Sequence, residues 1–169
     1  MIIRVSDLDD EGLTIDDPSA LAGAFSDPAW RLDRVHLRVQ PDGPEVLVHG
    51  EMQATIPQMC GRCTEDFPAR VQIPVEVRLA PRPSSADSIE LGRDDLDMDF
   101  YTDDQVDLRR VVEAETLLAL PMKPLCRDEC RGLCPVCGVN RNQTQCTCEV
   151  RPADPRLAVL ADLRARLNS

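Results

Sequence analysis

The stretch that organises this chain reads Cys126-Arg-Asp-Glu-Cys130-Arg-Gly-Leu-Cys134-Pro-Val-Cys137-Gly-Val-Asn-Arg-Asn-Gln-Thr-Gln-Cys146-Thr-Cys148. It holds six of the eight cysteines, and the other two form the upstream run Cys60-Gly-Arg-Cys63. A Cys-x-x-Cys-Gly run is typical of a zinc knuckle, because two thiolates grip one metal and the glycine lets backbone N–H groups approach the sulfur atoms. In a reducing compartment, cysteines paired in this way predict metal ligands rather than disulfides.

One tetrahedral site is predicted within this stretch, with two alternative ligand sets. The preferred set joins the knuckle pair to the last two cysteines, which are two residues apart and would face the same way on an extended segment. The competing set joins the knuckle pair to two earlier cysteines, which are four apart and would share one face of a helical turn. The preferred ligands are Cys134, Cys137, Cys146 and Cys148, and the competing set replaces the last two with Cys126 and Cys130.

If the preferred set is right, four cysteines remain, which is the number for a second site: Cys60, Cys63, Cys126 and Cys130. Without such a site, the upstream pair would be a redox pair or a buried turn. Four thiolates leave no open position for a substrate water, so the expected zinc is structural. Because residues 121–150 contain few large apolar side chains, chelation is expected to unfold this segment and to leave the strands intact.

Composition and charge describe an acidic body that carries a mildly basic module. The 169 residues are 43% hydrophobic and only 3% aromatic, so the core must be aliphatic. The net charge of −11 divides into −14 for residues 1–120 and +3 for residues 121–169. This pattern permits RNA contact at the C-terminal end. Aromatic side chains on which bases could stack are scarce, so we expect such contact to depend on the phosphate backbone or the shape of the RNA. No signal pattern or long apolar run appears, so we expect a cytoplasmic protein without a membrane span.

Alternating apolar residues predict a mainly antiparallel sheet or partial β-barrel. Alternation is found weakly over residues 1–8 and clearly over 30–39, 45–56 and 71–79, with a turn at 41–44 that makes the first two clear strands a hairpin. Pro74 predicts an edge position for the last of these strands, and Gly50 predicts a bulge or bend. A short strand at 98–101 is expected within an otherwise solvated acidic loop over 81–107.

A helix is predicted over residues 107–120, where Asp107 is a suitable N-cap and Pro121 ends the helix. The helical spacing places Leu108, Val111 and Leu118 on its apolar face. The fold class is therefore α+β, with this helix packed on the sheet and fixing a C-terminal cysteine-rich zinc module. The expected divisions are residues 1–120, the zinc-knuckle module 121–150 and a C-terminal helix within 151–169.

The sequence offers no catalytic constellation, so a non-enzymatic role is predicted. His36 and His49 are the only histidines, and both fall on predicted strands with polar neighbours. No phosphate-binding glycine loop or nucleophile triad spacing is present. A thioredoxin-type function for the Cys60 pair is disfavoured, because strands flank it on both sides.

Candidate RNA contacts are the basic side chains of the cysteine module and of the upstream cysteine turn. Arg34, His36 and Arg38 share one strand face and would extend this patch. For any single arginine, solvation or a salt bridge to a nearby acid is the alternative interpretation. The candidates are Arg62, Lys123, Arg127, Arg131 and Arg141.

Four motifs together resemble the YceD family of bacterial and chloroplast proteins. They are Gln58-Met-Cys-Gly-Arg-Cys-Thr, Leu117-Leu-Ala-Leu-Pro, the cysteine block, and Asp154-Pro-Arg-x-Ala-x-Leu. The resemblance implies a factor needed for accumulation of large-subunit ribosomal RNA, acting on its synthesis, processing or stability by binding that RNA or the assembling subunit. The rival hypothesis is an acidic adaptor that contacts a basic ribosomal protein or a processing nuclease and never touches RNA.

Overall fold

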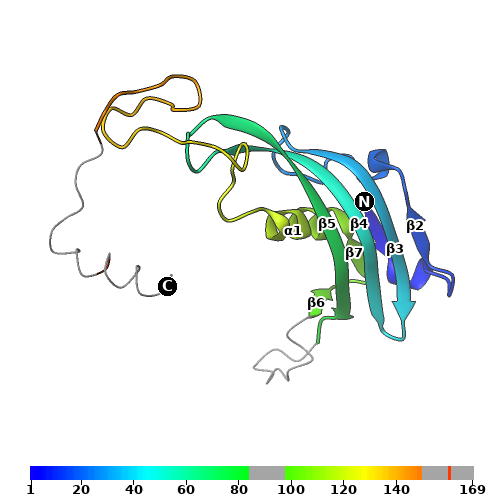
Figure 1. The fold of residues 1–169 in the computed structure, drawn as a ribbon. Helices are drawn as coiled ribbons and strands as arrows, with labels where there is room; N and C mark the ends of the chain where they lie inside the picture. The colour runs from blue at the N-terminus through cyan, green and yellow to red at the C-terminus, as the bar shows by residue number, and fades with distance from the viewer. Residues whose placement is uncertain (84–97, 150–159, 161–169) are drawn as a thin grey trace, which may run out of the picture.

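A curved five-stranded sheet forms the body of the protein in the computed structural model, which describes residues 1–83, 98–149 and 160. The strand order is β2-β3-β4-β5-β6, and all neighbours are antiparallel except β5 and β6. The sheet runs from one edge to the other without closing, so it is an open, partial barrel (Figure 1). The strands are β2 (Leu13–Ile15), β3 (Arg31–Asp42), β4 (Glu45–Met59), β5 (Asp66–Pro81) and β6 (Met98–Tyr101).

The long β4–β5 hairpin follows directly from the alternating sequence pattern. Its register is continuous from Val46 opposite Leu79 to Met59 opposite Asp66. Every second residue of β4 from Val46 to Ile56 faces inward, and all of these except Gly50 are buried. The predicted strand pattern is confirmed, and the turn that joins β4 to β5 is the segment holding Cys60 and Cys63.

Gly50 does not form the predicted bulge. It pairs with Leu37 on one side and Val75 on the other, without a shift in register. Its φ is +143°, and a Cβ there would lie 2.0 Å from the carbonyl oxygen of His36. The register shift lies instead between Leu32 and Arg34 of β3. Glycine is needed at position 50 because the backbones of β3 and β4 approach each other closely there.

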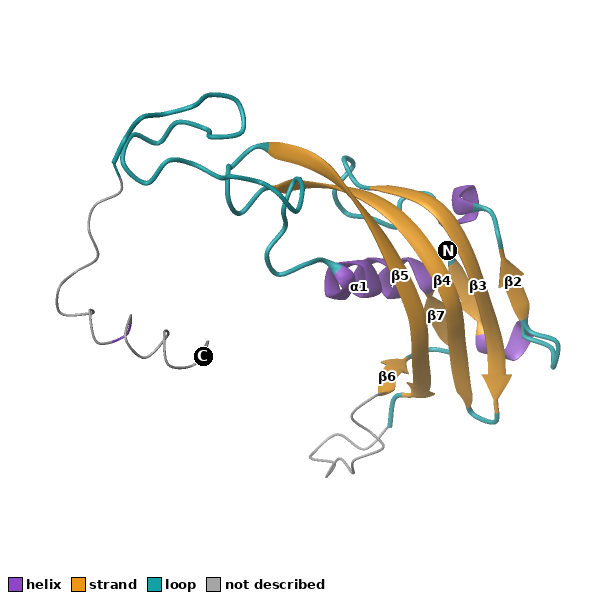
Figure 2. Cartoon of the chain, in the orientation of Figure 1, coloured by secondary structure: helices purple, strands orange, loops and turns teal. Residues whose placement is uncertain are grey.

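A second, two-stranded sheet and one helix cover the concave face of the large sheet (Figure 2). Strand β1 (Ile2–Arg4) pairs with β7 (Gln105–Asp107), and α1 (Leu108–Ala119) follows β7 directly. As predicted, the Asp107 carboxylate caps α1 by accepting from the N–H of Arg109. The predicted strand at 98–101 is β6, but β7 also falls within the stretch predicted as a loop over 81–107.

The apolar face of α1 differs from the predicted one at its C-terminal end. Leu108, Val111 and Val112 are buried as the spacing indicates, together with Thr116. Leu118, however, is 78% exposed. Helical periodicity alone therefore assigned too many leucines to the core.

Strand β5 forms an edge over most of its length. Only its last residues, Arg78 to Pro81, pair with β6, and within the described residues positions 66–77 have a partner on the β4 side alone. Pro74 lies in this unpaired stretch, which confirms the prediction made from its missing N–H.

Short 3-10 helices complete the body at η1 (Val5–Asp7) and η2 (Pro18–Leu21). Among the described residues, no helix combines the length and apolar character needed to cross a bilayer. The helix predicted within 151–169 lies outside the described residues, apart from the helical and exposed Leu160.

Candidate metal centres

The β4–β5 turn folds as a cysteine knuckle, defined here as knuckle 1 (residues 60–65). The backbone N–H groups of Cys126, Cys63 and Arg62 lie near Cys60 Sγ and lower the pKa of that thiol. The Thr64 N–H donates to the Cys60 carbonyl at 2.9 Å, and the Cys60 N–H to the Glu65 carbonyl at 2.9 Å. Thr64 has φ +59°, so a β-branched residue takes the left-handed conformation that closes the turn.

Residues 134–139 repeat this geometry and are called knuckle 2. The N–H of Cys134 donates to the Val139 carbonyl at 2.9 Å, and that of Gly138 to the Cys134 carbonyl at 2.9 Å. Gly138 has φ +74°. The two knuckles therefore share one backbone hydrogen-bond pattern, although one has threonine and the other glycine at the left-handed position.

Knuckle 1 meets two cysteines that follow α1, forming site 1. The four sulfur atoms lie within 4.8 Å of one another, so site 1 could hold a metal ion. The sulfur atoms of Cys60 and Cys130 are 3.7 Å apart, as are those of Cys63 and Cys126. Leu125 and Phe67 pack against the cluster. Its ligands would be Cys60, Cys63, Cys126 and Cys130.

Knuckle 2 meets the last two cysteines, forming site 2. These four sulfur atoms also lie within 4.8 Å of one another: Cys134, Cys137, Cys146 and Cys148. The structure thus brings together the preferred set and the leftover set, and does not group the competing set. The predicted helical turn around Cys126 and Cys130 is wrong, since the two lie in a turn in which the Cys130 N–H donates to the Arg127 carbonyl.

In each site, thiols of lowered pKa lie beside thiols of raised pKa. The N–H of Cys126, with those of knuckle 1, lowers the pKa of Cys60 to about 6, whereas burial and neighbouring sulfurs raise the pKa of Cys126 to about 12. In site 2, the N–H of Cys137 helps lower the pKa of Cys134 to about 6, while the Cys137 sulfur and burial raise the pKa of Cys148 to about 12. Four thiolates cannot share so small a volume without a cation, and a divalent metal would supply that charge.

The segment around site 2 docks on knuckle 1, so the two sites form one unit. The Leu133 N–H donates to the Arg62 carbonyl at 3.0 Å. The Asn142 amide donates to Cys130 Sγ at 3.3 Å, and that of Asn140 to a Glu65 carboxylate oxygen at 3.2 Å. In Figure 1 this module projects beyond the end of β4 and β5.

Arg62, predicted as an RNA contact, is engaged within the module. One guanidinium nitrogen, Nη1, donates to the carbonyl oxygens of Asp128 at 3.1 Å and Cys130 at 3.0 Å. These bonds join knuckle 1 to the segment that carries the rest of site 1. They indicate a structural contribution, and RNA contact by Arg62 stays a prediction.

The other four candidate RNA contacts are exposed on the module: Lys123, Arg127, Arg131 and Arg141. No carboxylate within the described parts of the chain forms an ion pair with any of them. The three residues predicted to extend this basic patch, Arg34, His36 and Arg38, lie on β3 in the body and not on the module. His36 contacts the carboxylate of Asp16. His49 is half-buried on β4.

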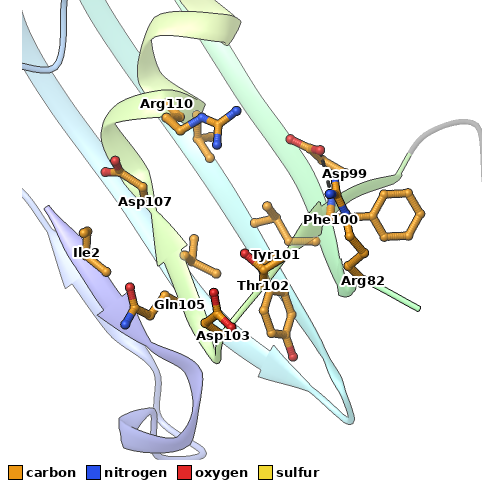
Figure 3. Close-up of a pocket in the computed structure, with 13 residues that line it drawn as sticks. Ile2, Arg82, Asp99, Phe100, Tyr101, Thr102, Asp103, Gln105, Asp107 and Arg110 are labelled. Atoms are coloured by element: carbon orange, nitrogen blue, oxygen red, sulfur yellow. Dashed lines mark hydrogen bonds between the residues drawn. The ribbon is translucent and has the colours of Figure 1, made fainter. Parts of the chain in front are cut away.

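The body contains a hollow of about 340 Å³ that is separate from both sites (Figure 3). Arg82 and Arg110 line it together with Asp99, Asp103 and Asp107, and neither histidine is among its lining residues. The hollow is therefore lined by charges of both signs, and its lining residues include no histidine or cysteine.

Comparison with known proteins identifies the same family. The sequence model of the family described as "Large ribosomal RNA subunit accumulation protein YceD" matches residues 48–164. Uncharacterized proteins of Mycobacterium tuberculosis and Mycobacterium bovis are 35% identical over 107 residues, covering 61% of this chain and 48% of theirs. One from Mycobacterium leprae is 31% identical over 104 residues, covering 62% and 46%. The chain thus spans about half the length of these relatives, and no solved structure matches it.

Fold and sites together define an α+β protein with a curved, open sheet and two four-cysteine centres that could each hold a metal ion. The chain belongs to the YceD family, as the match over residues 48–164 shows. That match contains all eight cysteines. The family's description refers to ribosomal RNA accumulation and names no catalysed reaction.

Proposed function

We propose that sites 1 and 2 each bind one structural Zn²⁺. Four cysteine sulfurs suit tetrahedral zinc and leave no position open for a substrate. Nearby backbone N–H groups lower the pKa of Cys60 and of Cys134, as expected where thiolates are stabilised. A redox role for the Cys60 pair is less well supported, because both of its sulfurs lie among two further cysteines.

The protein supports accumulation of large-subunit ribosomal RNA in the cytoplasm as a non-enzymatic factor that binds this RNA or the assembling subunit. The observation that carries this proposal is the family match, which spans the hairpin, α1 and both cysteine centres. The exposed Lys123, Arg127, Arg131 and Arg141 support direct contact, since cationic side chains dominate affinity for a phosphate backbone.

Ultraviolet crosslinking of the tagged protein in growing cells, followed by sequencing of attached RNA, tests this function. Reads should concentrate in one region of large-subunit ribosomal RNA or its precursor. The variant Arg127→Gln/Arg131→Gln/Arg141→Gln should lose this signal and should fail to restore RNA levels in a deletion strain. Arg4→Gln/Arg110→Gln, which removes exposed arginines from the body, should behave like the wild type.

The acidic adaptor is the second candidate function, favoured by the net charge of −14 on residues 1–120. It predicts a background crosslinking profile while RNA still fails to accumulate in the deletion strain. In that case Asp94→Asn/Asp95→Asn/Asp99→Asn/Asp103→Asn should abolish complementation, and the arginine variant should not. Asp104 and Asp107 are left unchanged, because they bond Ser6 and cap α1.

A further inference from the structure

The module carries two arginines on opposite arms of a small hairpin around knuckle 2. Leu133 and Asn140 form an isolated β-bridge. Beside it, the N–H of Arg141 donates to the Gly132 carbonyl at 2.9 Å. The N–H of Arg131 donates to the Asn142 side-chain oxygen at 2.8 Å. These bonds hold the backbones of Arg131 and Arg141 next to each other, although the residues are ten apart.

Both arginines line a hollow of about 360 Å³ together with Thr144, Gln145 and Cys146. The lining supplies two guanidinium groups, a hydroxyl and an amide, and no carboxylate. In a chain with 30 acidic residues, neither guanidinium has an acidic partner within residues 1–83 and 98–149. The hollow is thus a concentration of hydrogen-bond donors in which no lining residue carries a carboxylate.

We propose that this hollow binds a phosphate group of a single RNA strand. Arginine suits that ligand because its planar donor fork matches two phosphate oxygens at once. The Thr144 hydroxyl and the Gln145 amide can donate to the same two oxygens, since each accepts more than one hydrogen bond, or to the adjoining ribose. The inference rests on the proposed function and narrows it from a general basic surface to one subsite made by Arg131, Arg141 and Thr144.

The position of the hollow links it to site 2. Cys146 belongs to both, and Arg141 lies between knuckle 2 and the Cys146–Cys148 pair. Order in site 2 therefore helps to hold Cys146 and the segment from Arg141 to Gln145 in place around the hollow. Losing ligand Cys148, which does not line the hollow, should weaken phosphate binding although every lining residue is retained.

Fluorescence anisotropy with a labelled single-stranded RNA from the large-subunit sequence, titrated against full-length zinc-loaded protein at several salt concentrations, measures this subsite. The logarithm of the binding constant falls linearly with the logarithm of the salt concentration, and each phosphate contact on a single strand contributes about 0.7 to the size of that slope. At 0.1 M salt, one such contact raises the affinity roughly fivefold relative to 1 M salt. Arg131→Gln/Arg141→Gln should therefore weaken binding about 25-fold and lower the slope by about 1.4. Arg131→Lys/Arg141→Lys keeps the charge and should recover most of the slope but only part of the affinity.

The matched control is Lys123→Gln/Arg127→Gln, which removes two exposed charges of the same module outside the hollow. An equal loss in this control would overturn the subsite and indicate a diffuse basic surface. Unchanged affinity in Arg131→Gln/Arg141→Gln would also overturn it, while leaving direct RNA binding intact. Cys148→Ser should weaken RNA binding while site 1 keeps its zinc, and full affinity there would refute the link to site 2.

Nuclear magnetic resonance titrations of the same protein distinguish the sources of the phosphate. The RNA should shift the signals of Arg131, Arg141 and Thr144, whereas inorganic phosphate at equal concentration should not saturate them. If inorganic phosphate alone shifts them, the ligand is a free anion and the RNA assignment fails. If an acidic peptide shifts them and RNA does not, a protein partner occupies the hollow and direct RNA contact there is refuted.

Discussion

Gly50 is the residue at which the sheet least tolerates a side chain. Its φ is +143°, and a Cβ at this position would approach the His36 carbonyl oxygen to 2.0 Å, so alanine has no room unless β3 moves away from β4. The Gly50→Ala variant should therefore lose about 1–3 kcal/mol of unfolding free energy, as expected for steric strain at a special backbone position. Urea denaturation followed by circular dichroism measures this, with Gly43→Ala as the comparison, because Gly43 also has a positive φ (+60°) but an added Cβ there would meet nothing within 4 Å.

Asp33 gives the body a defined dependence on acid. It occupies the bulge of β3, where the hydroxyl of Thr55 and, at 2.7 Å, the Nε of Arg31 donate to its carboxylate and lower its pKa, against a smaller opposing effect of burial. A carboxyl whose pKa is lower in the folded state stabilises the fold above its unfolded pKa of about 4. That stabilisation is lost as pH falls through the folded pKa.

Thr55→Val removes the main cause of this shift. The pKa of Asp33 should rise toward its ordinary value, and the variant should lose stability at pH 7 but little at about pH 2, where the carboxyl is largely protonated in both states. Carboxyl chemical shifts and denaturant midpoints at the two pH values measure this. An equal loss of stability at both values would show that Thr55 acts through packing alone.

At the scale of elements, prolines protect the edge of β5 that has no strand partner within the described residues. Pro74 lies opposite Glu51 and Pro68 opposite Pro57, six residues apart and hence on the same side of the strand. Both lack an N–H on the side that faces away from β4, which removes donors that another chain could pair with. Another strand could therefore approach this edge, but it would find fewer N–H donors with which to pair.

Pro68→Thr/Pro74→Thr should restore those donors and make the protein self-associate. Sedimentation velocity should show dimers or larger species beyond those of the wild type at the same concentration, with unchanged zinc content. Pro28→Thr, in a loop, provides the matched control. A variant pair that sediments like the wild type would mean that the curvature of the edge, rather than its prolines, prevents pairing.

Sequence patterns predicted most elements because each was locally encoded. The period of two identified β3, β4 and β5, and Asp107 marked the start of α1. Leu118 was assigned wrongly because helical spacing reports a face and not how far along the helix its partner extends. The role of Gly50 was missed because it depends on His36, a residue of another strand.

At the scale of the whole molecule, the two cysteine centres should hold the module to the sheet. Native mass spectrometry should find two zinc ions per chain. A chelator should unfold residues 121–149, seen as loss of hydrogen-exchange protection there, while β3 and β4 keep theirs and the far-ultraviolet strand signal persists. Loss of the strand signal would contradict this division into an autonomous body and a metal-dependent module.

Separate ligand variants should distinguish the two sites. Cys148→Ser should release one zinc and leave Leu133 docked on Arg62, whereas Cys130→Ser should release the site 1 metal and free that contact. The Cys134 set could be predicted because its ligands lie close together in the sequence. Site 1 followed only by elimination, since Cys60 and Cys130 meet solely through the arrangement of β4, β5 and α1.

The composition of site 1 also has a topological consequence. Its ligands Cys63 and Cys126 stand before β5 and after α1, so a bound metal would convert everything between them into a closed ring. Such a ring lowers the entropy of the unfolded chain, as a cross-link does. One ion at the tip of the hairpin would thereby stabilise β5, β6, β7 and α1 together, including parts of the chain that it never touches.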